Sequence, residues 1–264
     1  MNPGGTGKVT ALAMLLVVVL ARAGFCGDTL SFPPTKYTIQ NPDSGATIGH
    51  SEYRSDASAD GATLQGENVF DNKQVDVETA HIEARQAGEG PTLLDWDHAF
   101  YRADGSILVR GYLDRKSGAA ACISNNPGQK TNQSETMSTP HDTWAGASVV
   151  VPIQGFLHEG DLGKTRSIHV FTCAPTAKIF AVSVKIDPQA AVWPAYGAEA
   201  LRVDIQPDFG LLNPIVESFV PKLQAWFDPN DGWAFVGDEA TRWYKGPHVR
   251  LVKVREPSNA GNAK

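Results

Sequence analysis

Two stretches in the second half of the sequence alternate between apolar and polar residues. The first covers residues 180–187, with apolar side chains at Phe180, Val182, Val184 and Ile186, and the second covers residues 201–206. Successive residues of a β-strand point to opposite faces, so each stretch predicts a strand with one face on a core and the other in water. This arrangement is typical of antiparallel sheets.

Shorter runs of the same kind predict further strands. They lie at residues 37–40, 62–70, 75–85, 98–102, 106–113, 148–156, 167–172, 223–227 and 248–255. The pair Asp104-Gly105 suits a tight turn between two of them, whereas residues 125–144 are polar, show no periodicity and are expected to form a loop. The chain is therefore predicted to be mainly β, with a curved antiparallel sheet or half-barrel and at most short helical segments.

The first 23 residues are typical of a secretory signal peptide. Lys8 supplies a positive charge, residues 11–20 are uncharged and apolar, and Ala21-Arg22-Ala23 matches the small-x-small cleavage pattern before Gly24. Ten apolar residues fall short of the roughly 20 needed to span a membrane, so we expect removal of this segment, with a retained anchor as the alternative. The expected organisation is a signal at 1–23, one β-rich domain at 24–256 and a disordered tail at 257–264, in a periplasmic or extracellular protein.

The charge balance argues against a nucleic-acid partner. The chain has 23 Lys and Arg against 29 Asp and Glu, and cleavage removes Lys8 and Arg22, so the mature charge is 21 − 29 = −8. Binding to phosphate backbones depends on clustered basic residues, and the sequence contains no such run.

Three cysteines follow the signal segment, at Cys26, Cys122 and Cys173. Exported compartments are oxidising, and Cys122 and Cys173 both lie in short apolar stretches, so we expect a bridge between them. The alternative is three free, buried thiols. Lipid attachment at Cys26 would need small residues just before it, and Phe25 occupies the adjacent position.

The densest polar cluster is Asp95-Trp96-Asp97-His98. In an extended chain Asp95 and Asp97 share one face, where their oxygens could bind a divalent cation, and His98 could act as a base. The alternative is a solvated strand entry. The sequence has neither the two-histidine spacing of zinc hydrolases nor a Gly-x-Ser-x-Gly motif, so we predict no metal site and no cofactor.

Aromatic residues gather in the last third of the chain. The candidates for lining a ligand site are Trp193, Trp226, Trp233, Trp243 and Tyr244. Aromatic rings offer a large contact area to an apolar ligand or a sugar, and the alternative is ordinary packing of a β domain.

The C-terminal third resembles a family of uncharacterised exported bacterial proteins, of the domain-of-unknown-function 3108 type. The matching segments read Ala200-Leu201-Arg202-Val203, Phe209-Gly210-Leu211-Leu212, Leu223-Gln224-Ala225-Trp226-Phe227 and Tyr244-Lys245-Gly246-Pro247. The resemblance implies a β-rich fold like the half-barrels of periplasmic lipoprotein carriers, and it implies no activity.

These observations favour a non-catalytic envelope protein that shelters a lipid-like or glycan ligand, or a partner segment. The alternative is a secreted hydrolase acting on an envelope polymer through Asp95, Asp97 and His98.

Overall fold

The computed structural model describes residues 33–58, 60–84, 90–127, 130–173, 176–208, 223–242 and 246–255. The predicted signal segment and the predicted tail lie outside these residues. The described strands are β1 (Thr35–Gln40), β2 (Thr47–Ser58), β3 (Gly61–Phe70), β4 (Val75–Glu83), β5 (Thr92–Tyr101), β6 (Ile107–Asp114), β7 (Ala119–Ser124), β8 (Thr131–Thr136), β9 (Thr143–Ala145), β10 (Thr165–Cys173), β11 (Ala177–Ile186), β12 (Ala191–Trp193), β13 (Ala198–Pro207), β14 (Leu223–Asp228), β15 (Ala234–Thr241) and β16 (His248–Lys253). A 3-10 helix η1 (Gly146–Val149) and an α-helix α1 (Val150–His158) follow β9.

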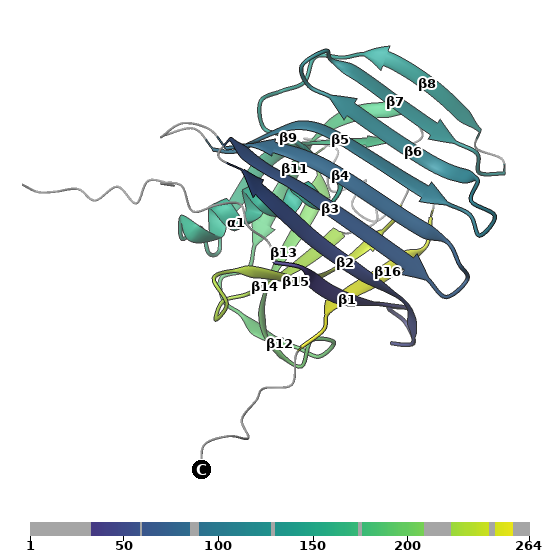
Figure 1. The fold of residues 1–264 in the computed structure, drawn as a ribbon. Helices are drawn as coiled ribbons and strands as arrows, with labels where there is room; N and C mark the ends of the chain where they lie inside the picture. Colours follow the sequence, from purple (N-terminus) through teal and green to yellow (C-terminus); the bar gives the residue numbers. More distant parts are fainter. Residues whose placement is uncertain are drawn as a thin grey trace, which may run out of the picture.

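The strands form one large sheet whose middle joins the two ends of the described chain. Its order is β8-β7-β6-β5-β4-β3-β2-β1-β16-β15-β14-β13-β11-β10-β9, and β12 pairs with β13 beside this path. Neighbours along the path are antiparallel except β9 and β10, which are parallel. Most neighbours are consecutive in the chain, so the sheet is built largely from hairpins (Figure 1).

The sheet curves until its two halves face each other, without closing into a barrel (Figure 1). The apolar residues of the concave face form two groups. The first core cluster joins both halves, because it contains Ala80, Trp96 and Leu113 from one half and Val184 and Leu201 from the other. The mainly β architecture predicted from the sequence, a curved antiparallel sheet with little helix, is confirmed.

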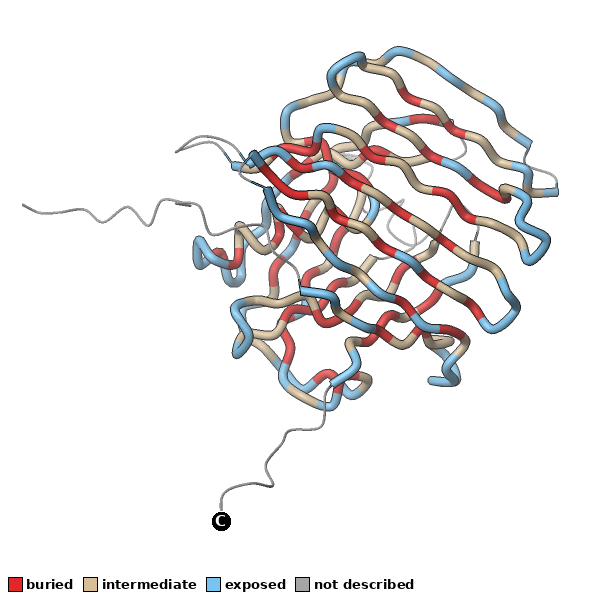
Figure 2. The backbone as a smooth tube through the Cα atoms, viewed as in Figure 1, coloured by how far each residue is buried: buried red, intermediate tan, exposed pale blue. Residues whose placement is uncertain are grey.

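The second core cluster lies on the strands around β1 and includes Ile39, Phe100 and Leu251. Buried and less buried positions alternate along most strands (Figure 2). Val182, Val184 and Ile186 are buried as the alternation predicts.

Two local predictions were wrong. Residues 148–156 fold as the end of η1 and most of α1, not as a strand. Ile153 and Leu157, four residues apart, both lie buried in the first core cluster, so tertiary packing overrides the β-propensity of the valines before them. Pro152 fits because it lies in the first helical turn, where its missing N–H costs little.

The second error concerns residues 125–144, which include strands β8 and the start of β9. Strand β8 is polar throughout and lies at the end of the sheet path, where it pairs only with β7 among the described strands. An edge strand with polar side chains on both faces has no period-two pattern to detect.

Candidate functional site

Strand β5 separates the three residues that the sequence singled out. Asp95 and Asp97 lie on the convex face of the sheet, where Asp95 Oδ1 contacts His81 Nδ1 at 2.6 Å and Asp97 Oδ2 contacts Arg110 at 2.6 Å. His98 lies on the concave face, because adjacent strand residues point in opposite directions. The structure therefore does not bring Asp95, Asp97 and His98 together.

On the concave face, polar side chains line up across neighbouring strands. Ser51 on β2 lies directly opposite Asn68 on β3, and Asn68 lies opposite Asp76 on β4. In the next row, Glu78 on β4 lies opposite His98 on β5. We name the following residues the polar belt: Ser51, Tyr53, Asn68, Asp76, Glu78, His98, Asp238 and Arg242.

The polar belt lies between the two apolar clusters. Along β5, His98 stands between Trp96, a member of the first core cluster, and Phe100, a member of the second. Asp238 enters from β15, where it pairs with Ala225 and Leu251, which belong to the first and second core clusters.

The centre of the belt is an ion pair between His98 and Asp76. His98 Nε2 lies 2.5 Å from Asp76 Oδ1, and the Asn68 side-chain amide donates to Asp76 Oδ2 at 3.1 Å. Burial alone would lower the pKa of His98, but the charge of Asp76 and the hydrogen bond to it outweigh burial and raise this pKa to about 9. His98 is therefore an imidazolium at neutral pH, stacked on the ring of Trp96.

Glu78 connects the belt to η1. Its Oε1 accepts hydrogen bonds from Trp96 Nε1 and from the backbone N–H of Ala147, each at 2.7 Å. Gly146 makes this approach possible, because a Cβ there would lie 1.9 Å from Glu78 Oε1. Burial raises the pKa of Glu78, while the charge of His98 and the hydrogen bond from Trp96 act against that rise.

A second ion pair comes from the end of β15. Arg242 donates to Asp238 Oδ1 at 2.8 Å, and their side chains are 10% and 19% exposed. Burial raises the pKa of Asp238 above its usual range, against the lowering effect of Arg242. The nearby Tyr53 stays a neutral phenol, because burial raises its pKa far above the usual value.

Three buried atoms of the belt have no hydrogen-bond partner among the described residues. They are Ser51 Oγ, Asn68 Oδ1 and Arg242 Nε. The large majority of buried polar atoms in proteins are paired, and leaving one unpaired costs about 1–3 kcal/mol. The belt thus combines two closed ion pairs with unused donors and acceptors.

The predicted aromatic site is divided between different places. Trp193 and Trp226 stack in parallel with ring centroids 4.2 Å apart, in a small cluster with Tyr196 on the face opposite the main core. Trp233 instead packs against the first core cluster, and its carbonyl accepts a hydrogen bond from Gln154. Trp193 and Trp226 are both 7% exposed, so their rings are largely used in packing.

Trp243 and Tyr244, the other two predicted aromatic candidates, lie outside the described residues.

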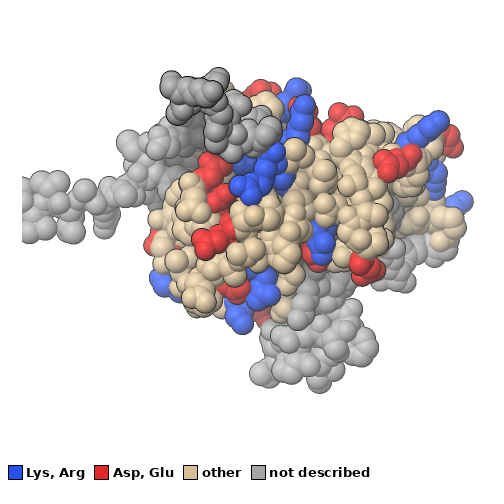
Figure 3. Space-filling model, turned by 90° about the horizontal axis from the view of Figure 1, so that it is seen from below, with Lys and Arg blue, Asp and Glu red and all other residues tan. Residues whose placement is uncertain are grey.

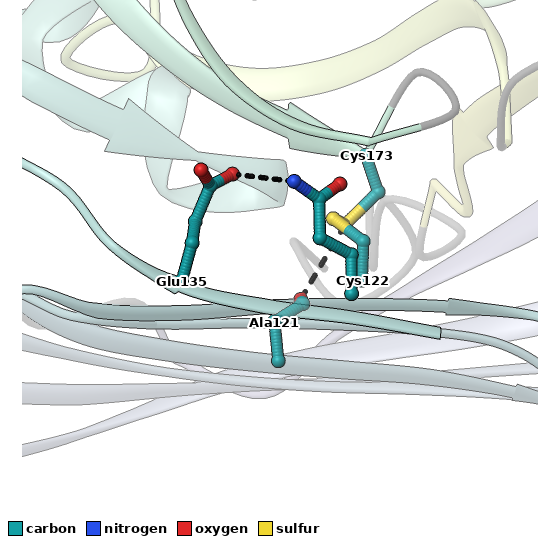
Figure 4. The surroundings of a disulfide bond; sticks show 5 residues. Ala121, Cys122, Glu135 and Cys173 are labelled. Carbon is teal, nitrogen blue, oxygen red and sulfur yellow. Dashed lines mark hydrogen bonds between the residues drawn. A yellow bond between two sulfur atoms is a disulfide. The ribbon is translucent and has the colours of Figure 1, made fainter. Parts of the chain in front are cut away.

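The structure contains the disulfide favoured by the sequence analysis, between Cys122 on β7 and Cys173 on β10 (Figure 4). The two cysteines are 51 residues apart in the chain, and their Cα atoms are 5.5 Å apart. The bridge joins strands from the two facing halves of the sheet. Beside it, the Gln133 side-chain amide donates to Glu135 at 3.1 Å.

In the part of the chain that the structure describes, no group of three His, Cys, Asp or Glu side chains is placed to hold a metal ion. Acidic and basic side chains are interspersed on the face shown in Figure 3. The described helices are all too short or too polar to cross a membrane.

Sequences and structures of known proteins add little to this description. No protein-family model and no curated protein matches the chain. Among solved structures, the chain is similar to a beta-barrel-like protein of domain of unknown function DUF1849 from Brucella abortus, with 15% identity and a TM-score of 0.47. That match covers 84% of this chain and 95% of the other. The resemblance to the 3108-type family stays a prediction.

The sequence analysis singled out only His98 among the belt residues. The sequence of β4 contains one signal for Asp76 and Glu78. Its apolar residues occupy odd positions at 75 and 77 but even positions at 80 and 82, so they lie on opposite faces of the strand. A strand that buries Ala80 and Ile82 also turns Asp76 and Glu78 inward.

Proposed function

We propose that this chain is an exported, non-catalytic binding protein of the cell envelope, which takes its ligand at the polar belt inside the curved sheet. The observation that carries the proposal is the buried arrangement of Asp76–His98 and Asp238–Arg242 beside three unpaired polar atoms. Ionisable groups with shifted pKa values, gathered on a concave surface, are characteristic of functional sites.

Stability alone gives a poor reason for these groups. Apolar residues of similar volume often replace a buried ion pair at no cost, and sometimes with a gain in stability. The belt lies between two apolar clusters that apolar side chains could have joined into one. We therefore attribute the retained charges to recognition.

The belt keeps some contact with solvent. The side chains of His98, Arg242 and Asp238 are 13%, 10% and 19% exposed. A ligand can approach through these exposed edges, whereas Ser51 and Asn68 lie deeper and are each 2% exposed.

Binding fits the belt better than hydrolysis. His98 is held as an imidazolium by Asp76, so its Nε2 is not a free base. Among the described residues, no hydroxyl or thiol hydrogen-bonds to His98, and Asp95 and Asp97 face away from it.

Two observations support export. The first is the signal-type sequence at residues 1–23. The second is the disulfide between Cys122 and Cys173, a bond that persists mainly in oxidising compartments such as the periplasm.

Native mass spectrometry of the mature protein, purified from its own cell envelope, tests the proposal. We expect a second species that is heavier by the mass of one bound molecule. Ser51→Leu should remove that species by filling the belt, and His50→Leu, one residue away on the convex face, should keep it. A bare protomer in every preparation, with the mass of a chain that still carries residues 1–23, would refute both binding and export.

A further inference from the structure

We infer that the ligand of the polar belt is an uncharged molecule rich in hydroxyl groups, such as a sugar unit. This inference rests on the proposed function and specifies its ligand class. It also chooses between the lipid-like and glycan ligands that the sequence left open, because the belt offers hydrogen bonds at the point where a lipid would need an apolar surface.

Four of the five ionisable groups of the belt form two pairs of opposite charge. Asp76 is paired with His98, and Asp238 with Arg242. Glu78 is the fifth ionisable group: its Oε1 accepts hydrogen bonds from Trp96 and Ala147, and burial raises its pKa, which favours the uncharged form. An anionic ligand would therefore face three buried carboxyl groups, and a cationic ligand would face a guanidinium and an imidazolium, in both cases after losing its hydration.

The three unpaired atoms of the belt differ in whether they donate or accept hydrogen bonds. Arg242 Nε can only donate, Asn68 Oδ1 can only accept, and Ser51 Oγ can do either. A ligand that satisfies all three must offer both donors and acceptors without a net charge. Sugar hydroxyls have this property, since each one donates and accepts.

The positions of Ser51 and Asn68 also suit one small ligand. The two residues are directly opposite on neighbouring strands, where side chains start about 4.5–5.5 Å apart. Asn68 is further fixed by its hydrogen bond to Asp76, so its free oxygen keeps a constant direction. Because both oxygens are buried, ligand binding requires a local rearrangement of the belt.

Three probes with the same ring separate the charge classes: glucose is neutral, glucuronate is anionic and protonated glucosamine is cationic. We would titrate each into the full mature protein and follow the indole N–H resonance of Trp96, assigned through Trp96→Phe. This group donates to Glu78 at the edge of the belt and reports on changes there. We expect saturable shifts with glucose, and at least about tenfold weaker binding of both charged probes.

A matched pair of variants locates the site. Ser51→Ala removes one hydrogen bond and should weaken glucose binding by about three- to tenfold. Glu52→Ala, on the convex face of the same strand, should leave binding unchanged.

Preferential binding of glucuronate or glucosamine would overturn the inference while leaving a binding function intact. The same conclusion follows if all three sugars fail to bind and the native spectrum shows a lipid mass. Failure of all probes together with a bare native mass would instead remove the proposed function itself.

Discussion

The two faces of β4 and β5 carry the same kind of histidine–aspartate contact in different surroundings. On the concave face His98 and Asp76 approach to 2.5 Å with side chains 13% and 5% exposed. On the convex face His81 and Asp95 approach to 2.6 Å with side chains 47% and 38% exposed. Residue types and distances nearly coincide, so burial is the main difference between the pairs.

Burial determines how strongly the two partners of each pair depend on each other. An exposed pair gains at most about 1 kcal/mol, because water and salt screen the attraction. A buried pair has lost its hydration, so each charge depends on its partner and on nearby dipoles. The convex pairs are thus replaceable, whereas the two partners of the concave pair depend on each other.

The largest expected effect comes from removing one partner of each pair. Asp76→Ala leaves the imidazolium of His98 buried and unpaired, and should lower the free energy of unfolding by about 3–5 kcal/mol. Asp95→Ala should cost less than about 1 kcal/mol. Urea denaturation of both variants measures the contrast. Equal losses would show that burial does not separate the two faces.

Removing the disulfide measures how much it stabilises the contact between the two halves of the sheet. Replacing Cys122 and Cys173 by serine should lower the free energy of unfolding by about 2–4 kcal/mol, because the unfolded chain regains the freedom of a long loop. Urea denaturation of the double variant and of the reduced wild-type chain should give similar midpoints. An unchanged midpoint in both would mean that the first core cluster holds the halves together without the bridge.

The sequence predicted the parts of this fold that follow the alternation rule. Strands β11 and β13 were predicted from their apolar residues, and these are buried except Phe180, which is half-buried. The turn at Asp104-Gly105 was also predicted correctly, and Gly105 adopts the positive φ of 79° that such a turn requires. In these segments local pattern and tertiary structure agree.

The polar belt was not predictable by the same rule, because its residues invert the pattern. On β4 the apolar Val75 and Val77 are half-buried on the convex face, whereas Asp76 and Glu78 are 3% and 9% exposed on the concave face. Arg242 joins the belt from the end of β15, after a separation along the chain that no local pattern can bridge. The proposed site therefore appears only when the sheet is curved.

Stability should depend on pH through the concave face. The pKa of His98 is raised from about 6.5 in the unfolded chain to about 9 in the folded one, so its contribution is complete below pH 6.5 and is lost as the pH rises through 9. The raised pKa of Glu78 acts in the same direction, beginning above its ordinary value. The urea concentration at the unfolding midpoint should therefore decrease as the pH is raised from 6.5 to 9.

The variant His98→Gln measures how much of this pH dependence of stability is due to His98. Its urea midpoint should be lower than that of the wild-type chain at pH 6.5, and the gap should narrow towards pH 9. His81→Gln, in the exposed pair, is the matched control and should change the free energy of unfolding by less than about 1 kcal/mol. A gap that stays constant across this range would contradict a charged His98.

The smallest expected effect concerns the convex face. Asp97→Ala removes the contact with Arg110, whose side chain is 44% exposed, and should change the free energy of unfolding by less than about 1 kcal/mol. That difference should vanish in about 1 M salt, where screening extends to a few ångströms. Thermal unfolding at low and high salt measures both points. A larger loss that resists salt would mean that Asp97 supports the belt through β5, and the two faces could no longer be treated as independent.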